Sequence, residues 1–236
     1  MEANHANLIA ADTKDSNEEI LRLLTNIALR GSDGVILQGC PNPDFDGEAF
    51  GAAIDLLKSK QIPVIVIDYG YGLNDLCCAV MNEAEVGRIA ARHFAQMGHT
   101  QVCAVCIAGD GLSEERFRGF REVAPDCFRI NTGSTLPEDL VRAEQHGITA
   151  FFCYNDPLAR ECMEIFRHAG ISVPDHVSVM GVDDTEIARF TNMTSIAHPK
   201  HQLGKYAAKE ILSRSDPRTK VFDPSLVQRN SVKPFR

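Results

Sequence analysis

The chain has 236 residues, of which 44% are hydrophobic and 24% charged, and its 17 glycines and 11 prolines are spread along its length, which excludes a disordered or fibrous protein. Its formal net charge of −8 makes it a poor general binder of nucleic acid, because an acidic surface repels a phosphate backbone. No apolar run approaches the length of a membrane span, and the first residues, from Met1 to His5, lack the features of a secretory signal.

Strand and helix patterns alternate along the first half of the chain. Apolar runs predict strands, and apolar residues spaced by three and four predict helices. The expected strands cover 6–10, 34–38, 62–67 and 79–81. The expected helices cover 16–29, 48–58 and 83–96.

The second half repeats this alternation. The expected strands cover 102–107, 128–131, 149–154, 177–182 and 194–197, and 221–232 should be extended. The expected helices cover 113–123, 137–145, 157–170, 185–190 and 200–212. We expect Ser113 to open the first of these helices and Asp156 to cap the helix that begins at Pro157.

Alternating strands and helices predict a doubly wound α/β fold with parallel sheets, because several strands are apolar throughout and must be covered on both faces. About eight or more strands fit two small sheets better than one. We therefore expect two lobes joined by short crossings, with a cleft between them. The first lobe should cover 1–98 and the second 99–195, with 196–220 returning to the first lobe and 221–236 forming a closing extended segment.

Polar residues follow many of the expected strands, and ligands of doubly wound sheets bind beyond the carboxyl ends of the strands. The polar candidates are Gln38, Asp68, Asn82, Asn155, Asp156, Asp183, Asp184 and His198, with Arg116 near the start of a helix and Tyr69, Tyr71 and Tyr154 nearby. Planar polar side chains that bind hydroxyls, beside an aromatic ring, suit a sugar. We expect Asn155 and Asp183 to contact the ligand and Asp156 to be a helix cap.

Catalytic motifs are absent, since the chain has no dinucleotide-binding glycine motif, Walker A sequence, nucleophile elbow or H-E-x-x-H. Asp183 and Asp184 are neighbours in a loop and should not converge on one atom, so we expect no catalytic residues and no cofactor. His198 and His201 have a spacing that only weakly suggests a metal. His201 should lie in the first turn of a helix, and we expect no metal site.

The eight cysteines show no framework spacing and are expected to be free thiols in a reducing cytoplasm. Cys103 and Cys106 have redox or half-zinc spacing, but they lie in an expected strand. Positions three apart in a strand face opposite sides of the sheet, so we expect these two thiols to be buried structural residues.

Several segments of the chain have a familiar order and spacing. They are 152–156, 170–174, 177–184, 193–196, 203–204 and 226–231, with Gly98-His99 and Arg116-x-x-Gly119-Phe120. Together they resemble the sensor domain of LacI/GalR-type transcriptional repressors, which implies a type I periplasmic-binding-protein fold. Within this family, 194–200 and 153–156 look most like arabinose-responsive repressors, which join a GntR-type winged-helix head to a LacI-type sensor.

The resemblance implies that the effector-binding residues are Asn82, Arg116, Asn155, Asp183 and His198. It also implies a sugar effector, with an arabinose-like pentose favoured, a homodimer, and operator DNA as a partner only through a head that is not in this chain. Sensor domains of this family open with a strand and a helix before the segment that matches Asn7. Both are missing here, which implies a truncated chain or a start codon placed too late.

Three hypotheses about function remain open at this point. The leading one is a cytoplasmic sensor in which a sugar closes the two lobes and changes the placement of two protomers. The second is a periplasmic sugar receptor of the same fold, which eight unpaired cysteines disfavour. The third is a small α/β enzyme, which the missing motifs disfavour.

Overall fold

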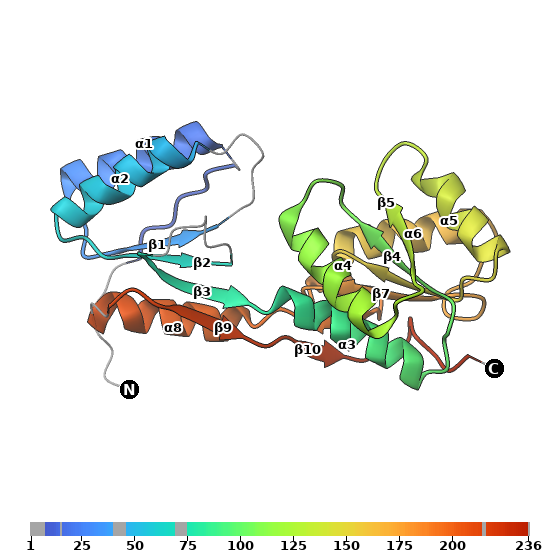
Figure 1. The fold of residues 1–236 in the computed structure, drawn as a ribbon. Helices are drawn as coiled ribbons and strands as arrows, with labels where there is room; N and C mark the ends of the chain where they lie inside the picture. Colours follow the sequence, from blue (N-terminus) through green and yellow to red (C-terminus); the bar gives the residue numbers. More distant parts are fainter. Residues whose placement is uncertain (1–7, 15, 40–45, 69–74, 214–215, 236) are drawn as a thin grey trace. The chain divides into compact units, whose positions relative to one another are not determined.

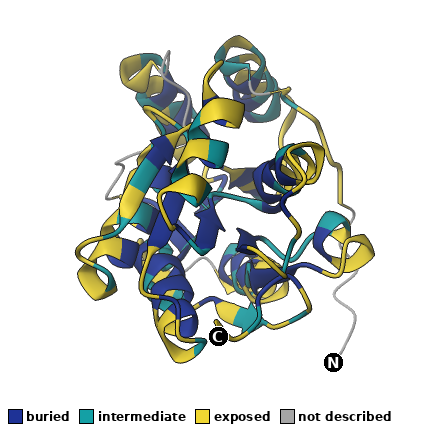
Figure 2. Cartoon of the chain, turned by 90° about the vertical axis from the view of Figure 1, so that its right-hand side faces the viewer, coloured by how far each residue is buried: buried dark blue, intermediate teal, exposed yellow. Residues whose placement is uncertain are grey.

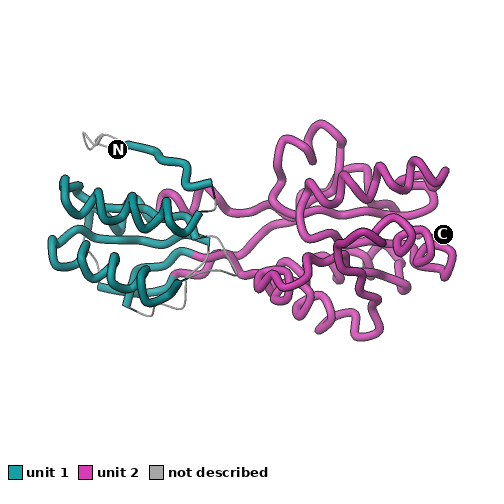
Figure 3. The backbone as a smooth tube through the Cα atoms, turned by 90° about the horizontal axis from the view of Figure 1, so that it is seen from above, with its two compact units in different colours: residues 1–79, 206–219 teal, residues 80–205, 220–236 magenta. Residues whose placement is uncertain are grey.

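The chain forms two compact units in the computed structural model, which describes residues 8–14, 16–39, 46–68, 75–213 and 216–235. Unit 1 consists of residues 1–79 and 206–219, and unit 2 of residues 80–205 and 220–236. The chain therefore passes from one unit to the other after residues 79, 205 and 219 (Figure 3).

Unit 1 is built on a four-stranded sheet with the strand order β1-β2-β3-β9. The strands are β1 (Val35–Gln38), β2 (Val64–Ile67), β3 (Cys77–Met81) and β9 (Thr219–Phe222), and β1, β2 and β3 are parallel. Helices α1 (Asn17–Arg30) and α2 (Gly47–Ser59) lie on one face of this sheet, and α8 (Lys200–Ser213) lies on the other (Figure 1). Ala207 and Ile211 of α8 pack against Ile65 and Cys77 of the sheet.

Unit 2 is built on a six-stranded sheet with the strand order β10-β8-β7-β6-β4-β5. The strands are β4 (Val102–Cys106), β5 (Phe128–Asn131), β6 (Ala150–Cys153), β7 (Ser178–Val182), β8 (Thr194–Ala197) and β10 (Ser225–Val227). Every strand is parallel to its neighbours except β10, which runs antiparallel to β8. The predicted doubly wound α/β class with parallel sheets is confirmed.

Helices cover both faces of the second sheet. Helices α3 (Glu83–Gln96) and α4 (Gly111–Val123) share a core with one face, and α5 (Leu136–Gln145) and α6 (Asp156–His168) share a core with the other. The short helix α7 (Glu186–Phe190) follows β7. Strands β4, β6 and β7 are buried at every position, and exposed residues lie mainly on the helices and loops (Figure 2).

Cys103 and Cys106 lie on opposite faces of this sheet, as predicted. Cys103 belongs to the core that contains Phe151 and Phe166, and Cys106 belongs to the core that contains Phe120 and Phe152. Both are buried, and burial raises the pKa of the Cys103 thiol and raises that of Cys106 to about 11. The two thiols therefore fill the interior as neutral groups.

The division into units differs from the expected lobes. An expected boundary at residue 98 assigns 83–96 to the first lobe, whereas α3 belongs to unit 2. The physical reason is that Val86 and Phe94 of α3 pack into the same core as Phe120 of α4 and Phe152 of β6. The helix therefore covers the second sheet.

The structure corrects three local predictions. No strand forms at 8–10, where Leu8 and Ile9 are exposed, while residues 6 and 7 of the predicted strand lie outside the described residues. Asp110, not Ser113, caps α4, since its carboxylate accepts a hydrogen bond from the Ser113 backbone N–H at 2.6 Å. Asn155, not Asp156, caps α6, because Asn155 has extended backbone angles and Asp156 is already helical.

Candidate functional site

Helices α3 and α4 of unit 2 approach each other closely through two glycines. A Cβ atom on Gly87 would lie 1.9 Å from the carbonyl oxygen of Arg116, and one on Gly119 would lie 1.8 Å from that of Ala84. Both distances are far inside van der Waals contact, so only glycine fits at these two positions. The crossing brings the first turn of α3 beside the side chain of Arg116.

Arg116 is held on two sides by protein groups. Its Nε donates to Oε2 of Glu83 at 2.6 Å, and its Nη1 donates to the backbone carbonyl of Tyr154 at 2.6 Å. The guanidinium also lies over the Tyr154 ring, 4.5 Å from the ring centre. Its Nη2 makes no hydrogen bond to the described residues, so one edge of a fixed guanidinium is available to a ligand.

The ion pair between Arg116 and Glu83 is largely buried, with 6% and 10% of the two side chains exposed. Burial raises the pKa of Glu83, although the positive charge of Arg116 and its hydrogen bond oppose that rise, and His198 opposes it to a smaller extent. Burial by itself would lower the pKa of Arg116, but Glu83 and then Asp183 raise it above its usual value. Arg116 therefore stays charged, and Asp183 and His198 lie within electrostatic reach of the pair.

Asp183 follows β7 in a backbone conformation that is unusual for an aspartate, with φ of 97°. Such a conformation costs about 1 to 3 kcal/mol and tends to occur at functional sites. Its N–H donates to the carbonyl of Ile196 at 2.8 Å, and Nζ of Lys200 donates to its carbonyl at 3.1 Å. The carboxylate accepts no hydrogen bond from the described residues and is therefore free to accept one from a ligand.

Asp184, the neighbour of Asp183, has a structural role. Its backbone N–H donates to the Ser195 hydroxyl at 3.1 Å, and its carboxylate lies 2.6 Å from Nη2 of Arg229. Arg229 thus engages the carboxylate of Asp184, whereas the carboxylate of Asp183 accepts no hydrogen bond from the described residues.

The two predicted asparagines both cap helices. Oδ1 of Asn155 accepts from the Leu158 backbone N–H at 2.9 Å, and its Nδ2 makes no hydrogen bond to the described residues. Oδ1 of Asn82 accepts from the Glu85 N–H at 3.2 Å, and its Nδ2 donates to Asp223 at 3.1 Å. Asn155 therefore has a donor to offer a ligand, whereas both polar atoms of Asn82 are engaged within the protein.

Asp156 is fully buried and ties three elements of unit 2 together. Its carboxylate accepts from the N–H and the hydroxyl of Thr185, at 2.7 and 2.9 Å, and from the Ser195 hydroxyl at 2.6 Å. Burial raises its pKa, although these hydrogen bonds oppose the rise. Asp156 thus fixes the turn that carries Asp183, and its predicted role as a cap is wrong.

The five predicted effector-binding residues are all in unit 2. Arg116 and Asp183, with Glu83, share one electrostatic cluster that also includes the half-buried His198. Asn155 immediately follows Tyr154, whose ring lies against Arg116. Sequence reasoning missed Glu83, because an acidic residue at the start of a helix is usually explained by the helix dipole and exposed to solvent.

Two other candidates, Gln38 and Asp68, belong to unit 1. Nε2 of Gln38 donates to the Asp68 carboxylate at 3.0 Å, and Asp68 has φ of 71°. Tyr69 and Tyr71 lie outside the described residues.

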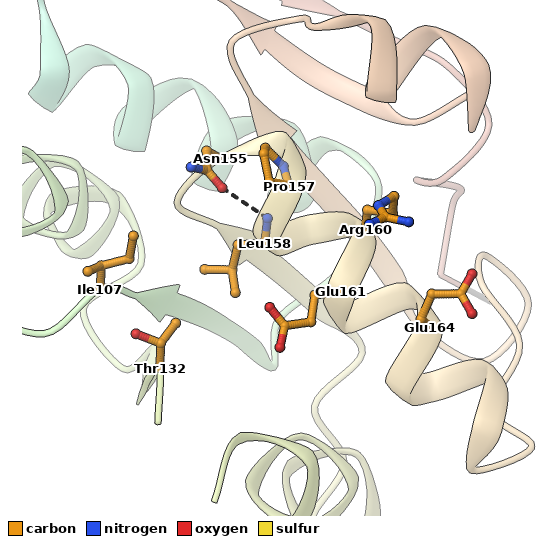
Figure 4. Close-up of a pocket in the computed structure, with 8 residues that line it drawn as sticks. All are labelled: Ile107, Thr132, Asn155, Pro157, Leu158, Arg160, Glu161 and Glu164. Carbon is orange, nitrogen blue, oxygen red and sulfur yellow. Dashed lines mark hydrogen bonds between the residues drawn. The ribbon is translucent and has the colours of Figure 1, made fainter. Parts of the chain in front are cut away.

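A surface hollow of about 570 Å³ lies beside the first half of α6 (Figure 4). Its lining includes Ile107 after β4, Thr132 after β5, and Leu158 and Glu161 of α6. Asn155 is the only predicted site residue in this lining, and its side chain is bonded to the Leu158 N–H. The hollow thus does not include the Arg116 cluster.

No cluster of three or more metal-ligating side chains occurs in the part of the chain that the structure describes. His201 is exposed in the first turn of α8. Among the helices of the described residues, none is long and apolar enough to span a membrane.

Comparisons with known proteins identify relatives of the chain. The family of periplasmic binding protein-like domains matches residues 91–232. An arabinose metabolism transcriptional repressor from Geobacillus stearothermophilus is 27% identical over 96% of this chain and 68% of its own length. The transcriptional repressor PurR from Photobacterium profundum is 30% identical over 96% of this chain and 72% of its own length, and PurR from Vibrio campbellii is matched over 59% of its length.

Solved structures share the fold. A LacI family transcriptional regulator from Enterococcus faecalis, with bound ribose, has a TM-score of 0.78 and 24% identity, covering 96% of this chain and 86% of that one. A periplasmic binding protein/LacI transcriptional regulator from Alkaliphilus metalliredigens, complexed with D-xylulofuranose, has a TM-score of 0.77 and 17% identity, covering 97% and 88%. At these identities the likeness shows the fold alone.

Proposed function

The chain belongs to the periplasmic binding protein-like domain family of LacI-type transcriptional regulators, and on this basis we propose that it is the effector-sensing part of a sugar-responsive repressor. Its relatives are transcriptional repressors and not enzymes. The effector that we favour is a pentose similar to arabinose. An arabinose metabolism repressor is among the relatives, and the structural neighbours hold ribose and D-xylulofuranose.

The observation that carries this proposal is the set of side-chain polar atoms around Arg116 that make no hydrogen bond to the described residues. Nη2 of Arg116 can donate to a hydroxyl oxygen, and the Asp183 carboxylate can accept from a hydroxyl hydrogen. Asn155 offers a further donor through its Nδ2. Fixed donors beside fixed acceptors suit a polyhydroxylated ring, because each sugar hydroxyl both donates and accepts.

In this proposal, the repressor activity is a property of a larger protein that includes this chain. The chain spans 59 to 72% of the length of the curated relatives described above, so operator binding by a further domain, a homodimer and a cytoplasmic location are all parts of the proposal. Sugar binding would bias a conformational equilibrium that the DNA-binding domain reads. The free cysteines of the described residues disfavour the alternative of a periplasmic receptor.

Titration calorimetry of the chain against a panel of pentoses and hexoses tests the proposal. We expect one or more pentoses to bind, and Arg116→Ala and Asp183→Asn to weaken that binding by about 1 to 3 kcal/mol each, since each leaves a polar partner unpaired. Matched controls are Arg118→Ala, on the exposed face of the same helix, and Asp175→Asn, an exposed aspartate paired with Lys233.

Control variants should bind the sugar as the unmodified chain does. If the folded chain binds no sugar in the panel, the proposed function is wrong. If a sugar binds but Arg116→Ala and Asp183→Asn leave its affinity unchanged, the site is elsewhere.

A further inference from the structure

We propose that the Arg116 site selects unphosphorylated sugars and that Glu83 is a positioning residue that sets this selectivity by neutralising Arg116. This inference rests on the proposed function and adds the charge class of the ligand. It begins from the buried ion pair, in which only 5% of the Arg116 residue is exposed. Because Glu83 pairs with it, charged Arg116 can donate a hydrogen bond while the ion pair as a whole carries little net charge to attract an anion.

Outside the ion pair, two carboxylates lie around Arg116, those of Asp183 and Asp110. The negative charge of the Asp183 carboxylate raises the pKa of both Arg116 and Glu83. Burial and the negative charges of Asp110 and Glu83 raise the pKa of the Tyr154 phenol, which lies beside the guanidinium. The basic side chains nearby are His198 and the exposed Lys200, whose Nζ donates to the Asp183 backbone carbonyl. A phosphate ester carries a charge of about −1.5 to −2 at neutral pH, so the acidic carboxylates would repel it.

The N-termini of the three nearby helices are already capped by protein side chains. Phosphates often bind the free N–H groups at the start of a helix. Here Asp110 accepts from the Ser113 N–H at the start of α4, and Asn155 accepts from the Leu158 N–H at the start of α6. Asn82 accepts from the Glu85 N–H at the start of α3. In each of these three helices, a side-chain oxygen of the protein already accepts from one of the N–H groups that a phosphate would use.

A neutral sugar avoids these penalties. Its hydroxyls can donate to the Asp183 carboxylate and accept from Nη2 of Arg116 without bringing a charge into the site. Replacing Glu83 by Gln keeps the size of the side chain but leaves the charge of Arg116 uncompensated. That change should make the site more tolerant of an anionic ligand.

The test is calorimetry on the whole chain with two matched pairs, ribose with ribose 5-phosphate and arabinose with arabinose 5-phosphate. We expect the neutral sugar of the better-binding pair to bind at least about a hundredfold more tightly than its phosphate ester. In Glu83→Gln this ratio should fall by about tenfold or more. Glu85→Gln is the control, since Glu85 lies on the same helix and pairs with Arg88 and Arg92 on the surface.

The outcomes separate this inference from the proposed function. If a phosphate ester binds as tightly as its neutral sugar, the selectivity inference is wrong while the sensor function stands. If neither member of either pair binds the folded protein, the proposed function fails for pentoses and the inference fails with it. An unchanged ratio in Glu83→Gln would refute the role of Glu83, and the ratio in the unmodified chain tests the charge argument even if that variant does not fold.

Discussion

His99 is a buried residue of unit 2 whose ring nitrogens are both engaged. Its Nδ1 lies 2.8 Å from the Thr149 hydroxyl, and its Nε2 lies 3.0 Å from the Lys233 carbonyl and 3.1 Å from the Ser178 hydroxyl. Burial lowers its pKa, which the hydrogen bond to Lys233 only partly offsets. The neutral ring thus connects the start of the second sheet to the C-terminal segment.

The lowered pKa of His99 predicts that the stability of the chain depends on pH. The pKa of His99 is lower in the folded chain than the ordinary value of 6.5. Its contribution to the free energy of unfolding is therefore fully present above pH 6.5 and is lost as the pH falls through the lowered pKa. The pKa of buried His93 is also lowered, by burial and by His99. His93 should therefore also reduce the free energy of unfolding as the pH falls. We expect the free energy of unfolding, measured in urea, to fall as the pH is lowered below about 6.5.

His99→Gln should reduce this pH dependence but not abolish it, because His93 remains. His201→Gln, on an exposed position of α8, is the control and should leave the pH dependence unchanged. Equal pH dependence in the His99 variant and the unmodified chain would show that His99 does not change its protonation on unfolding.

Some site residues could be predicted from the sequence and others could not. Arg116 and Asp183 could be selected from the sequence, because strand ends and a family motif both point to them. Glu83 and Asp156 could not be assigned, because their roles depend on burial by elements far away in the chain. Asp156 bonds Thr185 and Ser195, and no local pattern reveals those partners.

At the scale of elements, hydrophobic periodicity predicts much of the secondary structure. The predicted bounds 83–96, 128–131 and 194–197 coincide with α3, β5 and β8. Helix starts are predicted less well, since Asp110 and Ser113, or Asn155 and Asp156, are equally good caps by residue type. Backbone angles at the junction decide between them, and these depend on how the preceding strand enters the helix.

The crossing of α3 and α4 gives a prediction at this scale. Gly87→Ala or Gly119→Ala puts a methyl group against the backbone of the other helix, so the helices must separate. We expect a loss of roughly 1 to 3 kcal/mol or more in the free energy of unfolding, measured with chemical denaturant, and weaker sugar binding because Glu83 and Arg116 move apart.

Gly51→Ala is the matched control for this crossing. Gly51 lies within α2, and a Cβ atom there would meet nothing within 4 Å. Alanine should leave stability unchanged or raise it by up to about 1 kcal/mol, because alanine favours helix more than glycine does. Equal effects at Gly51 and Gly87 would contradict the close approach of α3 and α4.

At the scale of the whole molecule, the two units have separate sheets and cores, and the chain passes between them three times, after residues 79, 205 and 219. The number of sheets could be predicted from the number of strands, but the assignment of α3 to unit 2 could not. Its apolar face could cover either sheet, and the contacts of Val86 and Phe94 with the core around Phe152 decide the matter. All five predicted effector-binding residues lie in unit 2.

A crystal structure of the chain with the pentose that binds most tightly in calorimetry tests the central claim most directly. We expect a sugar hydroxyl within about 2.6 to 3.2 Å of the Asp183 carboxylate and another within that distance of Nη2 of Arg116. Glu83 should remain bonded to Nε of Arg116 in the same structure. A pentose bound in the hollow beside α6, or anywhere without contact to Arg116 and Asp183, would contradict the account.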